Sequence, residues 1–118
     1  MKISVGEENG VVIVSATGRM VCSTEVPLRC AINEVLEESR LPMLFDLSGV
    51  EFMDSSGLSL CIETHRLKSS RGEAFVCVGL NNSLLRLFQV SQANMRIPIC
   101  ENLQDGLALI ANASTSNI

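Results

Sequence analysis

The sequence predicts a mixed α/β fold with a largely parallel sheet of about five strands and about four helices. Two observations carry this prediction. An Asn-Gly pair separates two β-patterned segments near the start, and strand-like and helix-like patterns then alternate to the end of the chain. At 118 residues and 12.8 kDa, the chain has the length of one domain. We place that domain at residues 1–113 and expect a flexible tail at residues 114–118.

Residues 2–18 predict two short strands joined by a turn. Ile3 and Val5 alternate with polar residues, and Asn9-Gly10 is the strongest short hairpin signal. A β-branched run begins at Val11 and is expected to end at Gly18.

Residues 22–40 predict the first helix. Ser23 or Thr24 can cap it, and Pro27 falls in the first turn, where its missing N–H costs little. Apolar residues then recur at helical spacing, namely Leu28, Ala31, Ile32, Val35 and Leu36.

The rest of the chain continues the alternation. Residues 41–50 are almost continuously apolar through Leu47, as in a strand buried on both faces. A helix is expected from Ser56 to about Ser70, stopped by Gly72. The later elements are a buried strand at residues 73–80, a short helix at 81–91, a brief strand at 96–100 and a final helix at 102–113.

The amino-acid composition argues against several classes of function. The formal charge is -4, no Lys/Arg run occurs, and Trp and Tyr are absent, so we expect no binding to nucleic acid. The start of the chain lacks a signal-peptide pattern and no apolar run could span a bilayer, so we expect a cytoplasmic protein without direct membrane insertion. The five cysteines show no CxxC spacing, which predicts free buried thiols and no metal site.

The stretch "EFMDSSGLSL", residues 51–60, places two adjacent serines where a buried strand gives way to a helix. Asp, Ser and Gly are ordinary helix-start residues, so capping by Asp54 or Ser55 explains them structurally. The first turn of a helix also favours a phosphate, and the carboxyl edge of an α/β sheet is the usual place for sites. Capping and function can coexist here.

An enzymatic role for these serines is not expected. The stretch is not the GxSxG elbow of hydrolases. The single histidine, His65, lies on the same predicted helix, roughly 15 Å from Ser55. No phosphate-loop, dinucleotide or metal motif occurs, so we predict that the chain is not an enzyme and carries no cofactor of its own.

The helix after the serines offers two apolar faces. Leu58, Cys61 and Ile62 form the stripe expected to face the core. Leu60 and Leu67 lie on nearly the opposite side, with Thr64 between them. These side chains either pack beneath a neighbouring helix or form a contact patch for a partner.

The chain resembles the STAS domain family, and within it the bacterial single-domain anti-sigma factor antagonists. The likeness covers almost the whole chain. It rests on Asp46-Leu47-Ser48, on F-M-D-S-S-G-L at residues 52–58, on the Gly72-Glu73 turn, on the strand at 76–78 and on L-L-R-L-F at 84–88. The resemblance implies the STAS-type sheet.

The resemblance also implies a function. Such proteins bind an anti-sigma factor that is also a serine kinase, and phosphorylation by that kinase, which binds ATP and Mg²⁺, ends the binding until a serine phosphatase restores it. Carried over by position, the target is Ser55, with Ser56 the second candidate. The implied partner-binding residues are Asp54, Ser55, Ser56 and Gly57, where Gly57 would let the partner backbone come close. We add Leu60 and Thr64 from the second helical face.

One segment departs from the family pattern. After the second strand the family often carries acids that meet the partner, whereas here Gly18-Arg19-Met20-Val21-Cys22 contains none. Two other functions remain open: a regulatory or scaffold subunit of a stress-sensing or transporter-associated complex, and a small-molecule or nucleotide-binding STAS domain.

Overall fold

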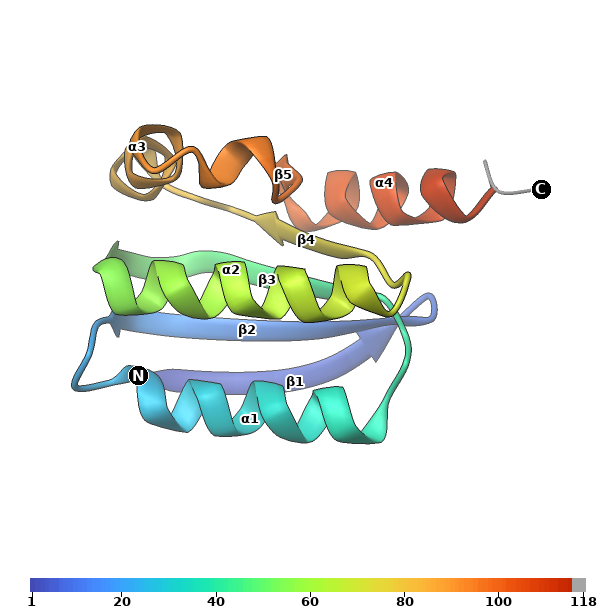
Figure 1. Ribbon diagram of the computed structural model, residues 1–118, viewed down its shortest axis with the longest axis horizontal. Helices are drawn as coiled ribbons and strands as arrows, with labels where there is room; N and C mark the ends of the chain where they lie inside the picture. Colours follow the sequence, from blue (N-terminus) through green and yellow to red (C-terminus); the bar gives the residue numbers. More distant parts are fainter. Residues whose placement is uncertain (116–118) are drawn as a thin grey trace.

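The computed structural model describes residues 1–115 as a five-stranded sheet flanked by helices (Figure 1). The elements in chain order are β1 (Lys2–Glu8), β2 (Val11–Met20), α1 (Glu25–Glu38), β3 (Met43–Met53), α2 (Ser55–Ser70), β4 (Phe75–Val78), α3 (Asn82–Val90), the 3₁₀ turn η1 (Ala93–Met95), β5 (Ile99–Cys100) and α4 (Leu103–Thr115). The strand order is β1-β2-β3-β4-β5; β1 and β2 are antiparallel and the other neighbours are parallel. The predicted mixed, largely parallel sheet is confirmed.

The hairpin at the start forms as predicted. Asn9 and Gly10 both have positive φ, 54° and 75°, which is the backbone twist that joins two antiparallel strands with a two-residue loop. The prediction that Gly18 ends the second strand is wrong. Gly18 adopts φ 114°, the register of β2 against β3 shifts there, and the strand continues to Met20. β3 likewise runs beyond residue 50, to Met53.

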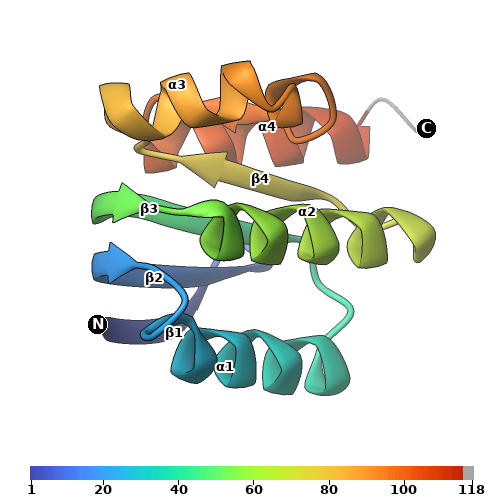
Figure 2. The same ribbon diagram turned by 60° about the vertical axis from the view of Figure 1, so that its left-hand side comes forward.

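Two helices cover one face of the sheet and α4 covers the other (Figures 1 and 2). Along β3, Phe45 and Leu47 belong to the cluster beneath α1 and α2, whereas Leu44 faces α4, so the predicted burial of this strand on both faces is confirmed. Gly106 lets α4 lie close to the sheet, because a Cβ there would come within 2.7 Å of Leu44 and Val78.

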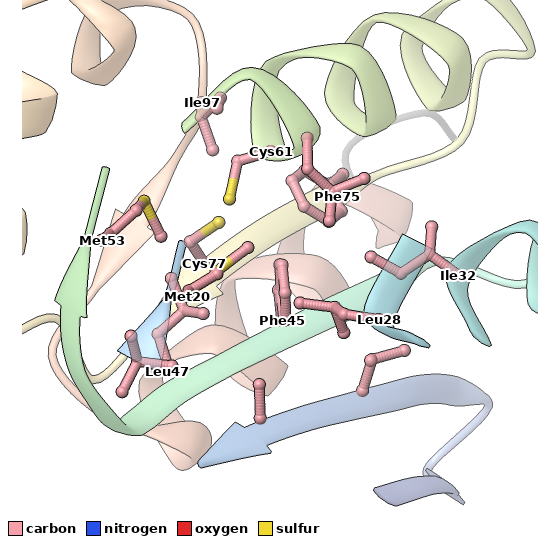
Figure 3. Close-up of a cluster of buried hydrophobic side chains, with 14 of the residues drawn as sticks. Met20, Leu28, Ile32, Phe45, Leu47, Met53, Cys61, Phe75, Cys77 and Ile97 are labelled. Carbon is pink, nitrogen blue, oxygen red and sulfur yellow. The ribbon is translucent and has the colours of Figure 1, made fainter. Parts of the chain in front are cut away.

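The larger core cluster is mainly aliphatic, with sulfur-containing side chains at its centre (Figure 3). Met20, Met53, Cys61 and Cys77 all lie in it. All five cysteines are free, as predicted, but the expectation of burial is confirmed only for Cys61 and Cys77, because Cys100 is half-buried and Cys22 and Cys30 are exposed. Cys22 lies in the loop after β2. Cys30 lies on the solvent-facing side of α1, away from the predicted apolar stripe of that helix.

Helix boundaries differ from the predictions in three ways. Thr24 occupies the position before α1, but its hydroxyl accepts from Val21 N and donates to Arg19 O, so it stabilises the preceding turn instead of capping the helix. α2 begins at Ser55, one residue early. α4 continues to Thr115, into the predicted tail, and residues 116–118 lie outside the described part of the chain. Within residues 1–115, no helix combines the length and apolar character needed to cross a membrane.

Candidate functional site

The site lies where β2 and β3 end side by side and α2 begins. Because the two strands are parallel, their carboxyl ends meet at one edge of the sheet, with Met20 opposite Met53. The backbone N–H of Asp54 donates to the Met20 carbonyl at 3.2 Å and fixes the start of α2 against the end of β2. The extension of both strands beyond their predicted ends therefore positions the serine motif.

Asp54 caps α2 with both carboxylate oxygens engaged. Oδ1 accepts from the Ser56 hydroxyl at 2.6 Å and from the backbone N–H groups of Ser56 and Gly57 at 2.9 and 3.3 Å. Oδ2 accepts from the Cys22 backbone N–H at 3.1 Å. These bonds, the Ser56 hydroxyl foremost, lower the pKa of Asp54 below its ordinary 3.8. The carboxylate thus joins the helix start to the loop after β2, and it stays charged at neutral pH.

The two serines differ in exposure and bonding. Ser56 is half-buried and its hydroxyl is committed to Asp54. Ser55 is exposed, and its hydroxyl makes no hydrogen bond to any described residue. Of the two, Ser55 is the hydroxyl that a visiting enzyme could reach without breaking an existing contact.

Gly57 does not have the predicted role. We expected it to admit a partner backbone, but it is buried against the chain's own strands. A Cβ on Gly57 would come within 2.7 Å of the Met53 side chain and 2.8 Å of the Met20 carbonyl oxygen. Gly57 is therefore needed for the close approach of α2 to the sheet.

The predicted contact patch on α2 is wrong for two of its three side chains. Leu60 and Thr64 are 2% and 3% exposed, and the Thr64 hydroxyl donates to the Leu60 carbonyl at 2.7 Å. The face of α2 that packs on the protein is centred on Cys61, Thr64 and Lys68, so Leu60 falls on its flank. The alternative that these side chains pack inside the molecule is correct for Leu60 and Thr64, whereas Leu67 on the same predicted face is 39% exposed.

A groove beside the serine motif was not predicted. It has a volume of about 650 Å³ and runs between the end of β3 and α3, lined by Phe52, Met53, Asp54, Asn82, Ser83, Arg86, Leu87 and Val90. Phe52 is 38% exposed and Val90 is 78% exposed. The guanidinium of Arg19 lies 4.9 Å from the centroid of the Phe52 ring, a cation–π arrangement.

The sequence did contain a signal for this groove. Val90 falls outside the stripe of α3 that buries Leu84 and Phe88, so it is an apolar residue on a solvent-facing side of its helix. Phe52, immediately before the serine motif, could be placed only once β3 was known to extend past residue 50.

His65 lies well away from Ser55, as predicted. It is half-buried further along α2, next to Phe75 and 3.3 Å from the Ser69 hydroxyl. Burial is the main cause that lowers its pKa, and Arg96 adds to the effect. No set of three or more His, Cys, Asp or Glu side chains within residues 1–115 is arranged to hold a metal ion.

Comparisons with known proteins agree with this architecture. A family model of the STAS domain matches residues 2–106, so the chain belongs to the STAS domain family. An anti-sigma F factor antagonist of Paenibacillus polymyxa is 25% identical over 103 residues, which cover 86% of this chain and 88% of that protein. The anti-sigma-F factor antagonist RsfB of Mycobacterium tuberculosis is 36% identical over 62 residues, about half of each chain.

The fold is also shared with solved structures. An anti-sigma factor antagonist from Mycobacterium paratuberculosis superposes with a TM-score of 0.86 at 25% identity, over 93% of each chain.

Proposed function

We propose that the chain is an anti-sigma factor antagonist, a binding module that sequesters an anti-sigma factor while Ser55 is unmodified. The relatives named above carry this function in their names, and their similarity extends over most of the chain. The observation that carries the site assignment is the exposed, unbonded hydroxyl of Ser55 beside the fully engaged Ser56–Asp54 pair. In this function the chain is a substrate for a kinase and does not itself catalyse.

The proposed switch is phosphorylation of Ser55 by the anti-sigma factor, acting as a serine kinase with its own ATP and Mg²⁺, and reversal by a serine phosphatase. A phosphoserine adds about -1.5 to -2 charges. At the start of α2 the helix dipole favours this charge by on the order of 0.3–1 kcal/mol. The negative carboxylate of Asp54 next to it directs the phosphate outward, toward a docked partner.

The cost arises in the complex. A buried charge without a partner costs several kcal/mol, and each 1.4 kcal/mol is about tenfold in affinity. The destabilisation of the complex therefore exceeds the small local effect on α2. We expect the modified domain to stay folded while its complex dissociates.

The exposed apolar side chains beside Ser55 replace Leu60 and Thr64 as the proposed partner contacts. Phe52 and Val90 rim the groove next to the motif, and Arg19 and Arg86 supply positive charge there. This charge takes the place of the acids that the family often carries after the second strand, so we propose a partner surface with complementary acidic residues.

The deciding experiment uses kinase-type anti-sigma factors from the source organism. The chain is incubated with each candidate, ATP and Mg²⁺, and the phosphate is located by mass spectrometry. We expect phosphate on Ser55, none on the Ser55→Ala variant, and normal labelling of Ser59→Ala, a matched change of an exposed serine one turn along α2.

Binding is then measured by calorimetry. Ser55→Asp is expected to weaken binding at least about tenfold without lowering the melting temperature, whereas Ser59→Asp keeps parental affinity. Equal affinity of Ser55→Asp and the parent would contradict the switch. Labelling that persists in Ser55→Ala would contradict the assignment of the site.

A further inference from the structure

A second concave region lies toward the opposite end of α2 from Ser55. It is a depression of about 330 Å³ lined by Ile62, His65, Arg66, Ser69, Arg96 and Ile97. His65 is ten residues beyond Ser55, roughly 15 Å along the helix, so the depression is separate from the serine motif.

Two unpaired arginines give this depression its charge. Arg66 and Arg96 are exposed, and neither forms an ion pair with any residue in the described range 1–115. By contrast, Arg29 and Lys68 each pair with glutamate. No acidic side chain lines the depression, although the chain as a whole carries a net charge of -4. Guanidinium groups bind phosphate through paired N–H donors, so two of them beside one hollow favour a phosphate ligand.

Polar and titratable side chains also line this depression. The Ser69 hydroxyl lies 3.3 Å from His65 Nε2, and both line the depression. The charged side chains around His65 are Arg66 and Arg96, which line this depression, and Glu73, which lies on the opposite side of the ring. Glu73 forms an ion pair with Lys68 at 2.7 Å. Burial and Arg96 both lower the pKa of His65, so its ring is neutral at neutral pH in the unliganded protein.

A second, mainly apolar hollow adjoins the depression. It has a volume of about 300 Å³, shares His65 and Ser69 and is walled mainly by Phe75, Pro98, Leu109 and Ile110. Phe75 stands beside the His65 ring, with the two centroids 6.2 Å apart. The two hollows adjoin at His65 and Ser69, one basic and the other apolar, and we call the pair the trough. Each hollow is in the size range of small-molecule sites.

We propose that this trough binds an organic phosphate monoester with an apolar or aromatic body. The phosphate lies between Arg66 and Arg96 and accepts from the Ser69 hydroxyl, while the body packs against Phe75, Pro98 and Leu109. The carboxyl end of α2 carries about half a negative charge, which opposes an anion, but two full positive charges at the hollow exceed it. Glu73 borders the apolar end and disfavours a second acidic group on the body.

The experiment uses His65 as the reporter, because it is the single histidine of the chain. Its ring signals are followed by NMR at a fixed neutral pH while phenyl phosphate, inorganic phosphate or phenol is added to the full chain. We expect saturable shifts with phenyl phosphate and weaker binding of the other two probes. We also expect saturation with phenyl phosphate to raise the pKa of His65, because a nearby anion favours the protonated ring.

Matched variants test the arginines. Arg66→Gln and Arg96→Gln are each expected to weaken phenyl phosphate binding at least about fivefold. Arg86→Gln makes the same charge change at the groove beside Ser55 and is expected to keep parental affinity. Circular dichroism is used to check that each variant remains folded.

The proposal is overturned by shifts that do not saturate at millimolar phenyl phosphate, or by parental affinity in the double variant Arg66→Gln/Arg96→Gln. Equal affinity for phenyl phosphate and phenol would remove the phosphate end, and equal affinity for phenyl phosphate and inorganic phosphate would remove the apolar end. None of these outcomes bears on phosphorylation of Ser55, so the two proposals can fail separately.

Discussion

Asp54 organises the serine motif through its two carboxylate oxygens. One oxygen holds the first turn of α2 and the hydroxyl of Ser56, and the other reaches Cys22 in the loop after β2. Two elements far apart in the sequence are thereby fixed to one carboxylate. This arrangement leaves Ser55 as the unengaged hydroxyl of the pair, held at a defined place by its neighbours.

We predict that the stability lost in the Asp54→Asn variant depends on pH. The pKa of Asp54 is lowered in the folded chain, so between its folded and unfolded pKa values the unfolded state binds more protons. Its contribution to stability is therefore present above about pH 4 and is lost as pH falls further. We expect the parent to be more stable than Asp54→Asn at neutral pH, and the difference to shrink in acid.

Denaturant unfolding across this pH range measures the effect. Asp105→Asn, an exposed aspartate in the first turn of α4, controls for the loss of one charge. A stability difference between parent and Asp54→Asn that stays constant down to the lowest pH would contradict the prediction.

The second residue-scale prediction concerns Gly57→Ala. An added Cβ would overlap the Met53 side chain and the Met20 carbonyl, which outweighs the better helix propensity of alanine. We expect the free energy of unfolding to fall by about 1–3 kcal/mol. Gly6→Ala is the matched control, because a Cβ on Gly6 meets nothing within 4 Å. An equal effect of the two substitutions would show that α2 does not depend on this close approach.

At the scale of elements, the buried face of α2 is partly polar. Lys68 is 1% exposed, and its amine donates to the Leu41 carbonyl at 2.6 Å and to Glu73 at 2.7 Å. The lysine joins the end of α2 to the segment before β3 and to the turn before β4. With Thr64 and Lys68 near the middle of this face, hydrophobic spacing alone misplaced it by part of a turn.

The element-scale prediction is that Lys68→Ala strongly destabilises the fold. Its loss leaves the Glu73 carboxylate and the Leu41 carbonyl without their donor and opens a void beneath α2. We expect the free energy of unfolding to fall by about 3 kcal/mol. Lys2→Ala, an exposed lysine on β1, should change it by less than about 0.5 kcal/mol. Comparable losses in both variants would mean that the buried amine contributes nothing special.

At the scale of the whole molecule, two core clusters on opposite faces of the sheet hold the strands on which the site is built. The edge that carries Ser55 also gathers exposed apolar side chains from β3 and α3, elements separated by the whole of α2 and β4. Parallel strands bring these segments to a common edge.

We predict that the edge of the sheet that carries Ser55 is the binding surface for the partner. Val90→Ser is expected to weaken binding of the anti-sigma partner roughly tenfold, because an exposed apolar contact is lost. Val90 is 78% exposed, so the melting temperature should not change. Val5→Ser makes the same exchange at the half-exposed edge strand β1 and should retain parental affinity. Equal affinities for both variants and the parent would move the interface elsewhere.

Three features could be predicted from the sequence alone: the order of the strands and helices along the chain, the hairpin at Asn9-Gly10, and the placement of Ser55 at a strand-to-helix junction. These features follow from local periodicity, turn chemistry and a specific motif, which act over a few residues. Packing between elements, which the sequence does not show, places Gly57, Leu60 and Thr64 inside the molecule. It also buries Lys68 against Glu73 and brings Phe52 and Val90 to one surface groove. The reason is that burial depends on which elements pack together, and contacts between distant segments leave no periodic pattern in either segment alone.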